Sequence, residues 1–230
     1  MRAVLTLLIL LGSFQSFSQD INPGNYSRQI KQHRLDYKAE FLKETRSPLK
    51  KEDLSKLRFY KAGKDYLVNA KVEMLHNQQP FKMLTFDGTA KQYVRYALLK
   101  FNLKGQEKSL TLYQSIALMQ NDQYKDYLFL PFTDLTNSSA TYGGGRYIDL
   151  KIKDISTGNF QLDFNKAYNP YCAYSTGYSC PIPPEENDLK ISVKAGEKKF
   201  AGEKKHKELA SLFVIPHNSQ VFVLGWPHKI

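Results

Sequence analysis

The amino-acid sequence predicts a mainly β protein, an antiparallel sandwich or barrel-like sheet of about eight to ten strands with one or two N-terminal helices. Aromatic residues make up 13% of the chain, an excess that favours strands because flat side chains pack well on a pleated surface. After residue 59, apolar and polar residues alternate with a period of two between turn sequences. No alternation of strands with helices follows, which argues against a parallel sheet.

An amphipathic helix is expected near the N-terminus, because Ile30, Tyr37 and Phe41 recur at helical spacing between charged residues. The Ser-Pro pair at positions 47 and 48 matches the N-cap and first-turn preferences of a second, short helix. The helical part of the chain is therefore expected to cover residues 26–58.

The alternating segments that follow predict about eight strands. They cover residues 65–75, 81–86, 92–103, 108–118, 127–132, 146–152, 159–164 and 189–193. A last hairpin is expected at residues 211–226.

The first 18 residues have the features of a signal peptide. Arg2 precedes an apolar run that is too short to span a bilayer, and small residues stand at 16 and 18, where a signal peptidase would act. No cysteine follows that position, so a lipid anchor is not expected. The sequence thus predicts an exported protein, periplasmic or secreted, with one β-rich domain over residues 19–230.

The chain is basic, with 33 Lys and Arg against 22 Asp and Glu, a net charge of +11. Weak association with anionic surfaces is one interpretation of this charge, and a lysine-rich solvated surface is the simpler one. The predicted compartment and the lack of a recognisable binding motif argue against nucleic acid as a partner. The expected partner is a small ligand or a component of the cell envelope, of unknown identity.

Two cysteines, Cys172 and Cys180, are expected to form a disulfide in an oxidising compartment. A redox pair is the alternative, but such pairs usually have two intervening residues rather than seven. A zinc site that combines these cysteines with a distant histidine is a further alternative. No other metal-ligand spacing occurs among the histidines, and no cofactor is expected.

The motif-bearing region, residues 128–199, contains a strand with Phe132 on its apolar face, and Asp134 continues the register of that face. Arg146 precedes the apolar face of the next strand in the same way. A charge on an apolar face must be paired, so a bidentate Asp134–Arg146 ion pair is predicted. The glycines at 143–145 open a strand rather than a helix, which favours a turn over a phosphate-binding loop.

Further polar residues of this region are candidates for a ligand-binding rim or for structural contacts to loop backbone. With Asp134 and Arg146, they form the predicted site: Tyr142, Asp163, Asn165, Tyr168, Glu186 and Asn187. Structural contacts are the favoured interpretation. Near the C-terminus, the repeated hexapeptide AGEKKF–AGEKKH, residues 195–206, is interpreted as a duplicated, solvated surface loop.

Four segments together resemble the uncharacterised bacterial family known as domain-of-unknown-function family 1684. They are TYGGGRY with the residues preceding it from Phe132, DFNKAYNP at 163–170, CPIPPEEN at 180–187 and AGEK at 195–198. The family pattern has glycine where this chain has Ser138, and glutamate where it has Ala140. The resemblance implies an exported protein and no established activity.

Three functions remain open from the sequence. The first is a non-enzymatic exported β-domain that binds a small ligand or envelope component. The second is a hydrolase-like enzyme with Asp134, Asp163 or Glu186 as acid or base and Arg146 as anion holder. The third is a purely structural envelope protein. The chain contains neither a G-x-S-x-G nor an H-E-x-x-H motif, so no reaction is indicated.

Overall fold

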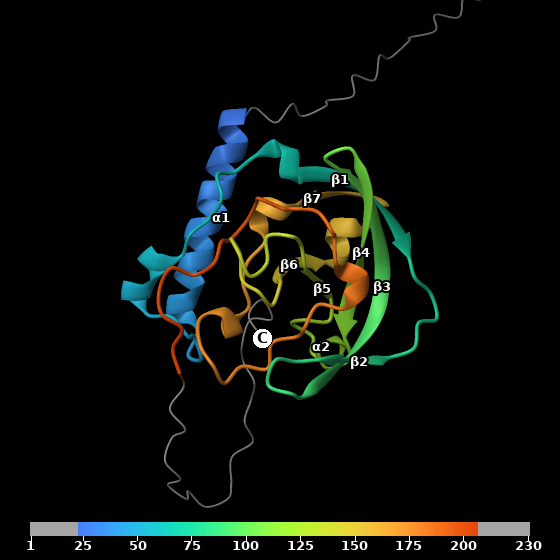
Figure 1. Ribbon diagram of the computed structural model, residues 1–230. Coiled ribbons are helices and arrows are strands. Elements are labelled where there is room, and N and C mark those ends of the chain that lie inside the picture. The colour runs from blue at the N-terminus through green and yellow to red at the C-terminus, as the bar shows by residue number, and fades with distance from the viewer. Residues whose placement is uncertain (1–22, 207–230) are drawn as a thin grey trace, which may run out of the picture.

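The computed structural model describes residues 23–206, so the predicted signal peptide and the predicted hairpin at 211–226 lie outside the described residues. Within them, a curled antiparallel sheet of seven strands dominates the molecule (Figure 1). The strands are β1 (Leu67–Met74), β2 (Phe81–Leu84), β3 (Ala90–Leu103), β4 (Gln106–Ser115), β5 (Tyr127–Phe132), β6 (Arg146–Lys151) and β7 (Asn159–Asp163). Their order is β6-β5-β4-β3-β1-β7, with β2 paired to one end of β3. The mainly β, antiparallel prediction is confirmed.

One strand prediction is wrong, and one predicted strand ends earlier than expected. Residues 189–193 form no strand, because their hydrogen bonds go one at a time to the loop after β5 and Lys190 has a positive φ of 51°. Leu189 donates its backbone N–H to Thr133, and Ile191 accepts one from Leu135. The predicted strand at 108–118 ends at Ser115, where the short helix α2 (Ile116–Met119) begins.

The N-terminal helix α1 (Pro23–Lys43) lies along one side of the sheet (Figure 1). The predicted face is confirmed, since Ile30, Tyr37 and Phe41 are buried, together with Tyr26. The second predicted helix is a 3₁₀ helix, η1 (Lys51–Lys56), and it begins later than expected. Its start is fixed by the backbone N–H of Lys50, which donates to the Asp53 carboxylate at 2.9 Å. No helix within residues 23–206 has the length and apolar character needed to cross a bilayer.

Hydrophobic residues pack on both faces of the sheet. One cluster is mainly aliphatic and includes Leu110, Leu112, Leu130 and Ile148. The other is rich in tyrosine and joins the opposite face of β5 and β6 to α1 and to residues 168–180. Burial on both sides explains why all six residues of β5 are inaccessible rather than every second one. The polar residues of β6 and of the following loops are therefore held between packed layers.

Candidate functional site

The predicted ion pair is present and completely buried. Arg146 Nη2 donates to Asp134 Oδ2 at 2.6 Å, and both side chains have no exposed surface. The pair is not bidentate, because Nη2 also donates to the Val193 carbonyl and Nη1 donates to the carbonyls of Ala195 and Glu197. The other oxygen of Asp134 accepts backbone N–H groups of Thr136 and Val193. Arg146 therefore fastens residues 193–197 to the sheet.

The glycines before Arg146 form a turn, as predicted. Gly145 has a φ of 86°, and a Cβ there would lie 2.7 Å from the Phe132 carbonyl oxygen. Ser138 has a φ of 67°, in the left-handed region that glycine favours. Tyr142 is half-buried, and its ring lies 6.1 Å from that of Phe86. No helix N-terminus is available here for a phosphate, which agrees with the turn interpretation.

The first copy of the repeated hexapeptide is buried, so its interpretation as a solvated loop is wrong. Glu197 has no exposed surface. Its carboxyl group accepts hydrogen bonds from Tyr37 at 3.0 Å, from Tyr174 at 2.7 Å and from the Asn169 backbone at 2.9 Å. Burial raises the pKa of the Glu197 carboxyl to about 7, although these donors oppose the shift. Glu197 thereby joins α1 to the loop that contains the disulfide.

Asp163 and Asn165 form a separate group at the other end of α1. Asp163 accepts hydrogen bonds from Tyr26 at 2.9 Å and from the Asn165 backbone at 3.0 Å. The Asn165 amide accepts from the Gly63 N–H and donates to the Gly63 carbonyl. Both side chains thus hold local backbone and helix α1 in place.

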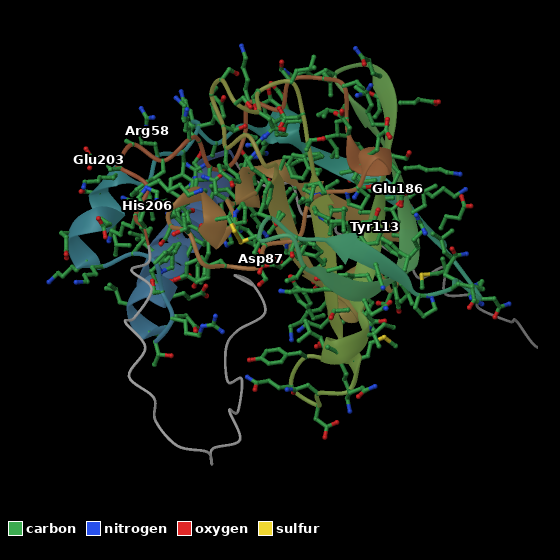
Figure 2. The ribbon with its side chains drawn as sticks, turned by 60° about the horizontal axis from the view of Figure 1, so that its bottom comes forward. Arg58, Asp87, Tyr113, Glu186, Glu203 and His206 are labelled. Atoms are coloured by element: carbon green, nitrogen blue, oxygen red, sulfur yellow. A yellow bond between two sulfur atoms is a disulfide. The ribbon has the colours of Figure 1, made fainter. Side chains whose placement is uncertain are left out.

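Glu186 and Asn187 face different surroundings although they are adjacent. Asn187 is buried and bonds both backbone groups of Thr111, and also the Pro131 carbonyl. Glu186 lies at the surface beside Tyr113 (Figure 2). It makes a bidentate pair with Arg95, at 2.8 and 3.0 Å. Arg95 is the main reason that the pKa of Glu186 is lowered.

The predicted site residues therefore do not form one rim. The carboxyl groups of Asp134, Asp163 and Glu186 share no hydrogen-bonding partner, and each satisfies its own neighbours. The structure does not support Arg146 as an anion holder, because its guanidinium group is covered by protein carbonyls. Structural contacts, the favoured interpretation, describe Asp134, Arg146, Asp163, Asn165 and Asn187.

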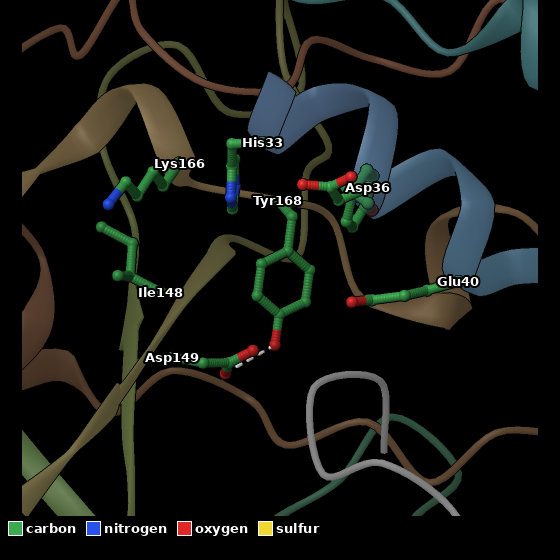
Figure 3. A pocket seen from close by; sticks show the side chains of 8 residues that line it. His33, Asp36, Glu40, Ile148, Asp149, Lys166 and Tyr168 are labelled. Atoms are coloured by element: carbon green, nitrogen blue, oxygen red, sulfur yellow. Dashed lines mark hydrogen bonds between the residues drawn. The ribbon is translucent and has the colours of Figure 1, made fainter. Parts of the chain in front are cut away.

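A cavity of about 130 Å³ lies between α1 and β6, next to the motif residues (Figure 3). Helix α1 supplies His33, Asp36, Tyr37 and Glu40, which share one helical face by their spacing of three and four residues. The opposite wall consists of Ile148 and Asp149 of β6, together with Lys166 and Tyr168. Tyr168 is the member of the predicted site that lines this cavity.

Asp149 is the centre of the sheet-side wall. One of its oxygens accepts a hydrogen bond from the Tyr168 hydroxyl at 2.8 Å (Figure 3). The same oxygen accepts a hydrogen bond from the Tyr127 hydroxyl at 2.5 Å. Burial raises the pKa of both tyrosines well above the ordinary value, and the Asp149 charge adds to this, so both remain neutral donors. On the helix side, burial lowers the pKa of His33, and the Lys166 ammonium group lowers it further.

Sequence reasoning missed five of these residues: His33, Asp36, Glu40, Asp149 and Lys166. The helical spacing of the first three was visible, but their partner surface was not. Asp149 stands at the parity opposite to the apolar residues Ile148 and Leu150, and the sequence does not show what covers that face of the strand. Instead, α1 and residues 166–168 cover that face of β6.

Cys172 and Cys180 form the predicted disulfide, with their Cα atoms 6.3 Å apart. Their thiolates are therefore not available as metal ligands. In the part of the chain that the structure describes, no group of three or more His, Cys, Asp or Glu side chains is arranged to hold a metal ion.

Comparisons with known proteins agree with this architecture. The chain is similar to an uncharacterised protein of Haloarcula marismortui whose solution structure was determined by NMR. The two are 32% identical, the match covers 76% of this chain and 95% of that one, and the TM-score is 0.59. No curated protein matches the chain significantly. The family model described as "Protein of unknown function (DUF1684)" matches residues 52–198, well over half of the 230 residues, and the chain belongs to this family.

Proposed function

We propose that this protein is an exported, non-enzymatic β-domain that binds a small ligand with a cationic group in the cavity beneath α1. The observation that carries the proposal is the lining of that cavity. Asp36, Glu40 and Asp149 bring three carboxyl groups, against the ammonium group of Lys166. This acidic lining occurs in a chain whose net charge is +11, so it is a local departure from the rest of the molecule.

The remaining lining residues suit a small ammonium group. Tyr37 and Tyr168 offer aromatic rings, and rings attract cations through their negative faces. Burial keeps the His33 imidazole neutral at a lower pH than usual, so His33 adds no repulsive charge near neutrality. The cavity of about 130 Å³ is well below the ~300–1,000 Å³ of pockets for drug-sized ligands. It therefore suits the head group of an amine rather than a complete cofactor.

Two observations support a binding role over catalysis by the predicted residues. Asp134 and Asp163 accept backbone N–H groups, and Glu186 is paired with Arg95. None of the three lines the cavity. The proposal of export rests on residues 1–18 and is consistent with the disulfide, since disulfides persist in oxidising compartments.

A thermal-shift screen tests the proposal with small primary amines, quaternary ammonium compounds and carboxylates of similar size. An amine at about 100 times its dissociation constant should stabilise the protein by roughly 2.7 kcal/mol. The stabilisation should disappear in Asp36→Asn/Glu40→Gln and persist in the matched surface variant Glu203→Gln. A screen in which no amine raises the melting temperature contradicts the proposal and favours a purely structural envelope protein.

A further inference from the structure

A groove of about 590 Å³ lies on the solvent-facing side of the sheet, over β1, β3, β4 and the start of β7. Of these strands, β3 and β4 lie on the side of the molecule away from α1 in Figure 1. Three lysines and three asparagines line the groove: Lys71, Lys100, Lys108, Asn69, Asn102 and Asn159. None of them lines the cavity beneath α1 or belongs to the predicted site residues.

The strand register places the polar groups in a line across the groove. Lys71 pairs with Asn159 on one side and with Lys100 on the other, and Lys100 pairs with Ser109. Four adjacent strands at the usual spacing extend this line over roughly 14 Å. The line therefore has the dimensions of an extended oligomer rather than of a single small ion.

The two central lysines lie directly opposite each other, an arrangement that destabilises a sheet because like charges repel. Glu73 compensates in part, through an ion pair with Lys100 at 2.5 Å, and Glu107 is the acidic residue of the lining. With Glu73 and Glu107 both counted, the three ammonium groups exceed the carboxylates at the groove by one positive charge. An anionic ligand would relieve the repulsion between Lys71 and Lys100.

We infer that this groove binds an acidic oligosaccharide, a sugar chain that bears carboxylate groups. The lysines would pair with the carboxylates, while the asparagine amides and Ser109 offer both donors and acceptors to hydroxyl groups. The concave shape favours a chain over a flat lipid surface. A nucleic-acid strand would need exposed rings for base stacking, and Phe101, which also contributes to the lining, is only 6% exposed.

Calorimetric titration with oligogalacturonate fragments tests this inference, with a neutral glucan of equal length and anionic phospholipid vesicles as comparisons. The wild type should bind oligogalacturonate with an affinity that falls as salt rises, and should not bind the neutral glucan. Lys71→Gln/Lys100→Gln should weaken binding by about tenfold or more, since it removes both central cations. Lys51→Gln/Lys204→Gln removes the same charge outside the groove. This variant should change the affinity for oligogalacturonate by less than about twofold.

Folding of the groove variant is checked independently. Lys71→Gln/Lys100→Gln removes a like-charge pair and also the exposed Lys100–Glu73 ion pair, so its melting temperature without ligand should stay close to that of the wild type. Asp36→Asn/Glu40→Gln should leave oligogalacturonate binding unchanged, which separates this surface from the amine cavity. Absence of oligogalacturonate binding, an equal loss in both lysine variants, or preferential binding to the vesicles would overturn the inference.

Discussion

The hexapeptides at 195–200 and 201–206 share five of six residues, yet they occupy opposite environments. In the first copy, the alanine, glycine and glutamate are all buried. In the second copy, Ala201 and Glu203 are exposed, and Figure 2 shows Glu203 and His206 at the edge of the molecule. Burial of this sequence is therefore decided by the partners that the rest of the fold supplies.

Two sets of partners distinguish the copies. Arg146 donates to the carbonyls of Ala195 and Glu197, whereas the second copy is attached through Lys205, which pairs with Asp53. Gly196 has a φ of 71° and lies against the backbone of Ala167. The first copy is thus part of the structural framework, and the second is a surface extension of it.

The largest effect is expected from Arg146→Met, which should reduce the free energy of unfolding by about 3–5 kcal/mol. The substitution leaves the Asp134 carboxylate buried without its cation and leaves the carbonyls of residues 193–197 without a donor. Arg58→Met is the control, because Arg58 is exposed and donates only to the Lys199 carbonyl. Urea denaturation measures the loss of unfolding free energy in both variants. Equal losses would show that Arg146 has no special role in holding the first copy.

Gly196→Ala should cost about 3 kcal/mol, because alanine would be forced into a left-handed conformation against backbone atoms. A Cβ at residue 196 would lie 2.5 Å from the Ala167 carbonyl oxygen. At Gly202 the nearest atoms belong to the side chains of Phe200 and Lys56 rather than to the backbone, and the backbone is not in the left-handed region. Gly202→Ala should therefore cost less than Gly196→Ala in the same assay. Similar costs for the two variants would contradict the proposed difference between the copies.

A smaller effect is expected on the pH dependence of stability. Because the pKa of Glu197 is raised to about 7 in the folded protein, that protein binds more protons than the unfolded chain between pH 4.5 and 7. The contribution of Glu197 to the free energy of unfolding is thus fully present below pH 4.5 and is lost as the pH rises to about 7. The loss should be about 1–3 kcal/mol.

Urea denaturation at pH 5 and pH 8 measures this change. Between pH 5 and pH 8, the free energy of unfolding of Glu197→Gln should fall by about 1–3 kcal/mol less than that of the wild type. Glu203→Gln should follow the wild type. The comparison with the wild type is needed because the lowered pKa of His33 acts in the opposite direction, adding stability as the pH rises. An unchanged pH dependence in Glu197→Gln would argue against a protonated, buried carboxyl group.

Features fixed by local periodicity could be predicted from the sequence. Alternation placed Asp134 and Arg146 on one apolar face, and helical spacing identified the buried face of α1. The position of α1 against the sheet depends on packing between distant segments, so the cavity could not be foreseen. For the same reason, the surroundings of Asp149 and Glu197 could not be predicted, since their cover comes from residues more than ten positions away.

The matched family range begins at residue 52, so the α1 wall of the cavity lies outside it. The sheet-side wall, with Asp149, Lys166 and Tyr168, lies inside. In the proposed function, the buried hydrogen bonds of Asp134, Arg146 and Asn187 stabilise the sheet and its loops, and α1 completes the binding site against them.

Titration of a small primary amine into the wild type and Lys166→Gln tests the central claim, that the cavity beneath α1 recognises a cation. Lys166 is the ammonium group among the lining residues, so its removal should tighten amine binding, by about fivefold if it contributes about 1 kcal/mol of repulsion. Lys204→Gln, at an exposed position in the second hexapeptide, should leave the affinity unchanged. Weaker amine binding in Lys166→Gln, or binding of a small carboxylate that depends on Lys166, would contradict the claim.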